Sequence, residues 1–431
     1  MIDRRASSRL PGAQKTRCGT CGLLHRTWYD RHPHRARDLS CGPHRIYLAV
    51  ELRRVACRCC GKVKQEQLDF LAENPFYTKR FAFWVGRRCR ASTIQDVARE
   101  THLNWKTVKA LEMQYMREQL RRSGKPGPRS IGLDEVSIRK GHSYRIVVSD
   151  LVRQRPIWFG GVDRSEPSLD AFFAWLGPGK SARIRLAVMD MWKAFRHSTT
   201  RNAPNAKILF DKFHVLRHLS DALDAVRKRE YARLRGNDRR FIKGQKYTLL
   251  SHRENLTLEG RQALKTLLAA NKRLHTAYVL KESFGQLWDY QREGWARRFF
   301  EQWRAALKWQ RLKPYEEFAA LIDRHWDGIT AYCEPRNKVS LGFVEGLNNK
   351  VRVIQRRAYG LRDPEYLRLK ILTCMLPEIS NRPKSPTRLG EDPLFVMRSI
   401  VTRSGPGRLN TSAGASSDPS LTRPFAYPEA R

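Results

Sequence analysis

Three acidic residues are the first candidates for chemistry in this sequence. Asp134 lies in a strand-like run, Asp190 ends another, and Glu345 stands in a segment with helical periodicity. Carboxylate oxygens are the ligands that hard divalent cations prefer, and phosphate oxygens can complete the coordination. Two such ions can activate the attacking oxygen and stabilise the leaving oxygen of a phosphodiester. We therefore expect these three acids to bind Mg²⁺ or Mn²⁺ at a catalytic site for phosphodiester transfer.

Asp211 and His214 are secondary candidates beside these acids. Both follow the last strand expected in this region, whose neighbour carries Asp190, so they could support the metal ligands or contact DNA. Asp211 could instead be a simple helix N-cap, because its side chain can accept a hydrogen bond from the first backbone N–H groups of a helix. Glu135 points to the opposite face of the strand from Asp134 and is not expected to replace it.

Clustered cysteines predict a metal site of a different kind. Six of the nine cysteines fall within the first 60 residues: Cys18, Cys21, Cys41, Cys57, Cys59 and Cys60. Cys18 and Cys21 form one C-x-x-C knuckle, and Cys57 forms a second with Cys60, for which Cys59 is the alternative. Two knuckles can bring four thiolates together as a closed, structural Zn²⁺ site. Cys41 is a spare candidate for the fourth ligand. The competing interpretation of the whole cluster is a set of ordinary free thiols. The isolated cysteines are expected in the core: Cys89, Cys333 and Cys374.

The charge of the chain indicates what these sites act on. The sequence has 83 Lys and Arg against 42 Asp and Glu, a formal net charge of +41. So large an excess favours phosphate-backbone partners and is more than small acidic metabolites require. There is no apolar run long enough to cross a membrane, and the basic N-terminus lacks the apolar stretch of a secretory signal. We expect a cytoplasmic, nucleoid-associated protein that binds double-stranded DNA.

Residues 92–112 have the pattern of a helix-turn-helix. Ser92 and Asn104 are placed as N-caps of two short helices with separate apolar faces. The residues expected to meet DNA stand at the start of the second helix: Lys106, Thr107 and Lys109. His102 or Leu103 occupies the turn where Gly is common, so a plain helical hairpin is the alternative.

The elements that must position the acids follow after residue 126. Strands are expected over 130–138, 144–150, 156–160, 183–190 and 207–211, with a helix over 167–176 between the third and fourth strands. This is the order of a ribonuclease H-like sheet, and the fold class is therefore multidomain α/β. The first and fourth strands are neighbours in such a sheet, so Asp134 and Asp190 should converge on one edge.

A final amphipathic helix carries Glu345. Its apolar stripe is expected to dock on the sheet: Val344, Leu347, Val351, Ile354 and Ala358. An adjoining polar face would place Glu345 near the metals and three further residues near DNA: Asn349, Arg352 and Arg356. Gly360 is a natural end for this helix. The competing interpretation is a surface network between Glu345 and Arg352.

Four stretches resemble bacterial insertion-sequence DDE transposases of the ISL-three family: 131–144, 188–195, 210–215 and 343–350. The resemblance spans roughly residues 15 to 378. It implies that Asp134, Asp190 and Glu345 are the DDE triad, and that a zinc-binding N-terminus and a helix-turn-helix precede a ribonuclease H-like catalytic domain. The implied activity is binding of terminal inverted repeats followed by metal-dependent strand cleavage and strand transfer, in a homodimer or larger synaptic complex. The alternatives are a non-catalytic DNA-binding regulator and a nuclease of the same fold.

The distance between Asp190 and Glu345 is too long for a bare ribonuclease H fold, so an all-helical insertion is expected. Its tryptophans could form a bundle core or stack on unpaired bases beside arginines: Trp288, Trp295, Trp303 and Trp309, with Arg297, Arg298 and Arg304. The expected domains are 1–70 (zinc-binding, ribbon-like), 71–125 (helix-turn-helix), 126–217 (catalytic, first part), 218–335 (helical insertion), 336–378 (catalytic, last part) and 379–431 (flexible basic tail).

Overall fold

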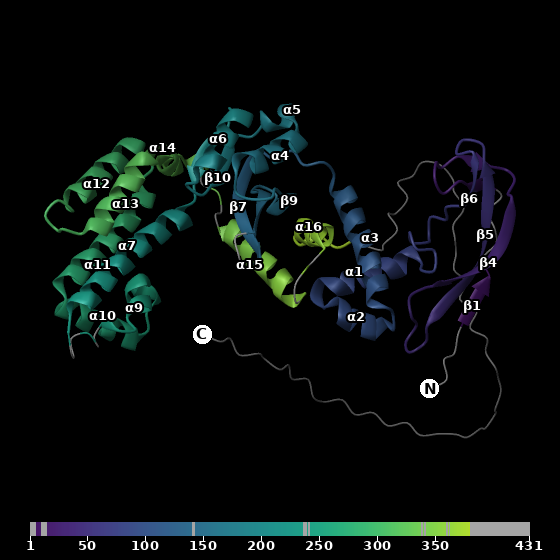
Figure 1. Ribbon diagram of the computed structural model, residues 1–431, viewed down its shortest axis with the longest axis horizontal. Helices are drawn as coiled ribbons and strands as arrows, with labels where there is room; N and C mark the ends of the chain where they lie inside the picture. Colours follow the sequence, from purple (N-terminus) through teal and green to yellow (C-terminus); the bar gives the residue numbers. More distant parts are fainter. Residues whose placement is uncertain are drawn as a thin grey trace, which may run out of the picture. The chain divides into compact units, whose positions relative to one another are not determined.

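The computed structural model describes residues 6–9, 15–139, 143–235, 239, 242–337, 339, 342–358, 361 and 363–379 (Figure 1). The basic tail expected over 379–431 lies outside the described residues except for Ile379, as does Gly360. In the described ranges, no helix combines the length and the apolar composition needed to span a membrane.

A small β-module precedes the helices. Its strands are β1 (Ala6–Arg9), β2 (Thr16–Arg17), β3 (Leu24–His25), β4 (Asp30–Arg37), β5 (Ile46–Cys57) and β6 (Lys62–Gln65). The central strand β5 pairs with β4 and β6 in antiparallel fashion and with β1 in parallel fashion. Cys57 is the last residue of β5, so this strand positions its thiol.

The next three helices are α1 (Lys79–Ala91), α2 (Ile94–Thr101) and α3 (Trp105–Ser123). Asn104 caps α3 as predicted, because its side chain accepts a hydrogen bond from the Lys106 backbone at 2.9 Å. The prediction for Ser92 is wrong by one position. The Ser92 backbone N–H still bonds to α1, and Thr93 caps α2 by accepting from the Asp96 backbone N–H. His102 forms the turn in the left-handed conformation that Gly commonly supplies, with φ 53°.

The central sheet contains β7 (Ser130–Arg139), β8 (Ser143–Asp150), β9 (Arg155–Gly160), β10 (Leu186–Met189) and β11 (Lys207–Phe210). Their spatial order is β11-β10-β7-β8-β9, with β10 parallel to both neighbours and β8 antiparallel to both of its own. The predicted proximity of the first and fourth strands is confirmed. The fourth strand is shorter than predicted and buried along its whole length, because both of its faces are covered.

Helices cover the two faces of this sheet. On one face lie α4 (Glu166–Leu176) and α6 (Lys193–Asn202), with the short α5 (Pro178–Ser181) beside them. Leu169 and Phe172 of α4 share a core there with Ile131 and Leu133 of β7. On the other face lies α15 (Gly342–Arg357), whose Leu347 and Val351 pack in a core with Val136 of β7. Alternate residues of β7 therefore face α4 or α15, and Asp134 belongs to the α15 face.

The chain between β11 and α15 is helical, as its composition predicts. Its elements are α7 (Lys212–Arg233), α9 (Lys246–Leu250), α10 (Leu258–Ala270), α11 (Lys272–Phe284), α12 (Glu293–Ala305), α13 (Lys313–Arg324) and α14 (Trp326–Thr330), with 3-10 turns over 253–255, 285–289, 331–333 and 335–337. Helix α7 runs without interruption across residue 218, where we expected a domain boundary. Trp288 and Trp303 are buried in this core, whereas Trp295 and Trp309 are exposed.

Helix α16 (Pro364–Thr373) connects two parts of the chain that are distant in sequence. It contacts β9 of the sheet and α3 of the helix-turn-helix. Glu112 of α3 is 1% exposed and pairs with Lys370 at 2.6 Å, and it also accepts a hydrogen bond from the Tyr366 hydroxyl. Burial raises the pKa of Glu112 even though Lys370 lowers it. A buried charge of this kind is tolerated only with its partner present, so α3 and α16 depend on each other.

Close packing between α14 and β11 makes Gly328 a sensitive position. A Cβ at Gly328 would lie 2.4 Å from a ring carbon of Phe210, the residue before Asp211. We predict that Gly328→Ala lowers the free energy of unfolding by about 1–3 kcal/mol, because α14 or the ring must move. Thermal unfolding of the full chain measures this. Gly294→Ala is the matched control, since no atom lies within 4 Å of its added methyl group. Equal melting temperatures for the two variants would contradict the packing.

Candidate active site and metal centre

The register of the sheet brings Asp134 and Asp190 together. Val188 of β10 lies opposite Gly132 of β7 in a parallel pair. Continuing that register by two residues puts Asp190, just beyond β10, beside Asp134. Adjacent strands are about 4.8 Å apart, so the two backbones are direct neighbours.

Asp134 is held by two donors. Its Oδ1 accepts from the Glu135 backbone N–H at 2.7 Å, and its Oδ2 accepts from the side-chain amide of Asn348 on α15. Burial raises the pKa of Asp134 in spite of these hydrogen bonds and of the nearby His214. The protein therefore places a carboxylate where its charge is costly without a cation.

Asp190 is paired with a cation from α7. Its Oδ1 accepts from the Met191 backbone N–H at 2.6 Å, and its Oδ2 lies 3.3 Å from Nδ1 of His214. Burial favours a higher pKa for Asp190, but the hydrogen bond and charge of His214 outweigh it, so the pKa is lowered. The same hydrogen bond raises the pKa of His214 to about 9. The two groups therefore form an ion pair at neutral pH.

Asp211 has the capping role that the sequence suggested as an alternative. It caps α7, since its Oδ1 accepts from the Phe213 backbone N–H at 2.9 Å. It is also only 7% exposed and lies near the other acids. Burial raises its pKa, and the charges of Asp190 and Glu345 raise it further. Glu345 itself is exposed in the first turn of α15.

Gly132 allows α15 to approach the sheet closely enough for this cluster to form. A Cβ at Gly132 would lie 3.0 Å from Val344 Cγ2 and 2.8 Å from the Ser149 hydroxyl, so any larger residue would push α15 away. Val344 thus packs over Gly132 while Asn348 reaches Asp134. Four residues of helix rise about 6 Å and two residues of strand about 6.6 Å, so the two elements stay in step.

Asn348 is a site residue that the sequence analysis missed. Asn349, Arg352 and Arg356 are exposed, as expected for the polar face, but no role was expected for the preceding Asn348. Asn348 lies three residues after Glu345 and four after Val344, so it shares the edge of the apolar stripe. That spacing was the available signal, because a polar residue on the margin of a docked face can reach the sheet.

The cysteines form a tighter group than the acids. Cys18, Cys21, Cys57 and Cys60 place their sulfur atoms within 4.8 Å of one another, and this is the only such group of potential metal ligands in the described ranges. Cys59 is exposed and does not join it, so the geometry favours Cys60 as the fourth member. Cys41 is also exposed and outside the group.

Two glycines explain why Cys60 is favoured. In each knuckle the residue after the second cysteine is a glycine with positive φ, 76° at Gly22 and 65° at Gly61. Their backbone N–H groups donate to the carbonyls of Cys18 at 2.9 Å and Cys57 at 2.8 Å. The pattern C-x-x-C-G therefore occurs twice, and it would have selected Cys60 from the sequence.

The thiols fit a divalent cation. Hydrogen bonds from the backbone at Cys21 and Thr20 lower the pKa of Cys18 to about 6. The pKa of Cys60 is raised to about 12. The largest cause is its interaction with Cys21, and burial and the other thiols add to it. Four thiolates so close together cannot all form at neutral pH unless a cation compensates them. Four cysteines on two knuckles are the donor set of a structural Zn²⁺ site.

The candidate DNA-binding residues of the helix-turn-helix differ in their exposure and in their contacts within the protein. Lys106 is exposed at the start of α3, and Thr107 is half-buried. Lys109 pairs with Asp363, the N-cap of α16, at 2.6 Å. Its ammonium group therefore already has a partner within the protein, which we did not expect.

Comparison with known proteins identifies the family of this chain. Residues 131–371 match the ISL3 family of DDE-type transposases, whose description is "Transposase", and residues 66–115 match the helix-turn-helix domain of transposase family ISL3. The chain is 35% identical to the transposase for insertion sequence element IS1001 of Bordetella parapertussis, over 84% of this chain and 89% of that protein. It is 28% identical to the transposase for insertion sequence element IS1557 of Mycobacterium tuberculosis, over 86% of this chain and 88% of that protein. The chain therefore belongs to the ISL3 family of transposases.

Proposed function

We propose that this transposase binds the terminal inverted repeats of an insertion sequence and catalyses metal-dependent cleavage and transfer of DNA strands. Asp134, Asp190 and Glu345 would be the catalytic residues. The observation that carries the proposal is the pairing of β7 with β10, which sets Asp134 and Asp190 side by side beneath α15. Family membership supports the same assignment.

We also propose that the catalytic domain is ribonuclease H-like and that the helices between β11 and α15 are an insertion in it. The strand order and the helices on both faces support this view. The first part of the domain would then end near β11 instead of at residue 217, because α7 already belongs to the helical region. In this arrangement α15 returns to the sheet only after the insertion and brings Glu345 with it.

The three acids would hold two Mg²⁺ or Mn²⁺ ions, which when bound activate the attacking oxygen and stabilise the leaving oxygen. Asn348 fixes the orientation of Asp134. His214 holds Asp190 ionised and offsets part of the charge of the cluster. The exposed Arg352 and Arg356 of α15 are in a position to bind backbone phosphates by charge-assisted hydrogen bonds.

Recognition of the DNA ends would fall to the N-terminal modules. The four cysteines would bind a structural Zn²⁺ and fix the β-module, and α3 would present Lys106 and Thr107 to the double helix. Cutting at two ends in one reaction requires at least two active sites, so we propose a homodimer or a larger synaptic complex.

The first test removes one carboxylate. We predict that Asp190→Asn lowers Mg²⁺-dependent cleavage of end DNA by about a thousandfold or more, equal to at least ~4 kcal/mol of transition-state stabilisation, and leaves end binding intact. Gel analysis of labelled DNA measures both. Asp221→Asn is the matched control, since Asp221 is exposed on α7 away from the cluster, and it should cut at the wild-type rate. Unchanged cleavage by Asp190→Asn would refute the assignment, whereas cleavage without joining would indicate a nuclease.

The second test separates Cys60 from Cys59. We predict about one Zn²⁺ per chain in the wild type and in Cys59→Ser, measured by mass spectrometry, and a large loss of Zn²⁺ in Cys60→Ser. Chelation should melt the β-module and weaken end binding in the first two proteins, because the apolar core of this module is small and the metal would supplement it. Equal zinc contents in Cys59→Ser and Cys60→Ser would contradict the assignment.

The third test compares two lysines of α3. We predict that Lys106→Ala reduces the slope of log affinity against log salt by about 0.9, as expected when one phosphate contact is lost. Lys109→Ala should leave that slope unchanged and lower the melting temperature, because it breaks the pair with Asp363. Titrations of repeat DNA at several salt concentrations measure the slopes. The reverse pattern would show that Lys109, and not Lys106, meets the DNA.

A further inference from the structure

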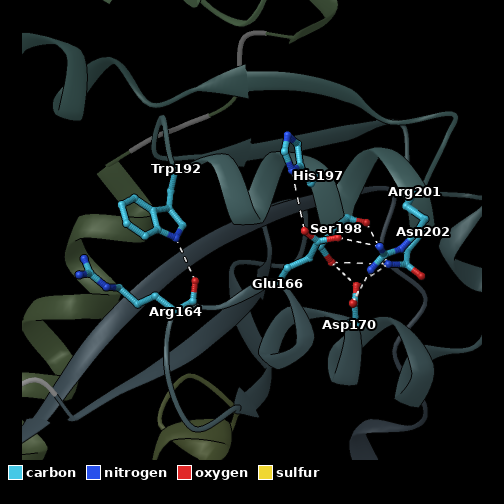
Figure 2. Close-up of polar contacts among 8 residues, drawn as sticks. All are labelled: Arg164, Glu166, Asp170, Trp192, His197, Ser198, Arg201 and Asn202. Carbon is cyan, nitrogen blue, oxygen red and sulfur yellow. Dashed lines mark hydrogen bonds and ion pairs between the residues drawn. The ribbon is translucent and has the colours of Figure 1, made fainter.

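An arginine near the strands that carry Asp134 and Asp190 contacts two aromatic rings. The guanidinium of Arg164, in the loop between β9 and α4, lies 4.5 Å from the ring centre of Tyr144 and 4.9 Å from that of Trp192. The Trp192 indole N–H donates to the Arg164 carbonyl at 2.9 Å, as Figure 2 shows. Trp192 follows Asp190 by two residues, so the stack is attached to the end of β10.

A carboxylate also pairs with this guanidinium. Nη1 of Arg164 donates to Oε1 of Glu135 at 3.2 Å. Glu135 directly follows Asp134 on β7. Arg164 is therefore ion-paired to the residue next to Asp134. It lies on the α4 side of the strand, opposite the face that α15 covers.

The contacts that hold Arg164 are more than neutralising Glu135 requires. A flexible Lys or Arg would suffice for the charge, but two rings fix the plane of a guanidinium and so reduce the entropy lost when it binds. About a third of the Arg164 side chain remains exposed, at 36%, and Trp192 is 42% exposed. A pre-oriented, partly exposed guanidinium is suited to bidentate binding of a phosphate.

Arg201, also visible in Figure 2, shows the contrasting structural case. It pairs with Glu166 at 2.7 Å and with Asp170, both on α4, while Ser198 and Asn202 also bond to Asp170. Two carboxylates occupy this guanidinium, and the network joins α6 to α4. Among the described residues Arg164 has one carboxylate partner, Glu135, which is the neighbour of Asp134 in the chain, and it lies over two aromatic rings.

We propose that Arg164 binds a phosphate of the DNA strand close to the phosphodiester that reacts, and that Glu135, Tyr144 and Trp192 position it. This inference rests on the proposed function, since it assumes that DNA reaches the acid cluster. The bound phosphate displaces water from the exposed edge of the guanidinium. The ion pair with Glu135 keeps the arginine anchored to the sheet.

The test measures binding, so it does not depend on catalysis. Cleaved end DNA is titrated with the full-length protein, with Ca²⁺ in place of Mg²⁺ to slow the reaction. A single uncharged methylphosphonate linkage is placed at each position of the end in turn. Arg164→Ala should weaken binding of unmodified DNA roughly tenfold or more, the value of a hydrogen bond to a charged group. At one position the methylphosphonate should weaken binding by the wild type by the same factor. With the linkage at that position, Arg164→Ala should cause no further loss of affinity.

Two further variants define the contact. Arg164→Lys keeps the charge but loses the planar fork, so it should bind less tightly than the wild type and still respond to the same linkage. If Arg164→Ala fails to fold, as judged by its melting curve, this variant carries the test. Arg183→Ala is the matched control, because Arg183 is an exposed cation before β10, at the opposite end of that strand from Asp190. It should show no position-specific effect.

Two results would overturn the proposal. Wild-type affinity in both Arg164 variants would show that Arg164 makes no contact, and an equal loss at every linkage position would show only a general effect of charge. Failure of the proposed function is a separate result, seen as wild-type protein that does not cut with Mg²⁺. The linkage pattern is read from binding and distinguishes the two.

Discussion

The burial of two neighbouring carboxylates, Asp134 and Asp190, is the constraint on which the rest of the site depends. Asp134 lies within β7 and Asp190 just beyond the end of the adjacent parallel strand β10, and burial disfavours a charge on both. Each carboxylate accepts the backbone N–H of the residue that follows it, and each then takes a donor from a distant segment, Asn348 or His214. These partners hold the acids in place, and a divalent cation would remove the remaining cost.

This constraint accounts for the long path of the chain between β11 and α15. His214 must stand on the first turn of α7, so α7 has to start directly after β11, and Asp211 caps it there. Asn348 must come from the opposite face, so α15 returns over Gly132, the one position on β7 where it can approach closely. The helices between them pack against Phe210 through α14 and thereby support the strand that leads into Asp211. The helical region thus stabilises both ends of the acid cluster.

Periodicity and order predicted what depends on short-range pattern. They identified the five strands, the docking stripe of α15 and the convergence of Asp134 with Asp190, because strand alternation and helical spacing are local properties. They failed where long-range packing decides between neighbours. They missed Asn348, which reaches Asp134 where α15 packs over Gly132, and they missed the pairing of Lys109 with Asp363, far along the chain. The choice of Cys60 over Cys59 was different, since the glycine after each knuckle was visible in the sequence.

The surplus of +41 charges does not by itself keep the acids ionised. Most of these cations are on the surface, where salt screens them beyond about 10 Å. Burial still raises the pKa of Asp134 in this strongly basic protein, whereas the pKa of Asp190 is lowered by the single imidazolium in contact with it. A contact of 3.3 Å thus outweighs what the distant surplus supplies. The exposed cations are therefore suited to attract the DNA backbone, whereas His214, in contact with Asp190, maintains the local order of the site.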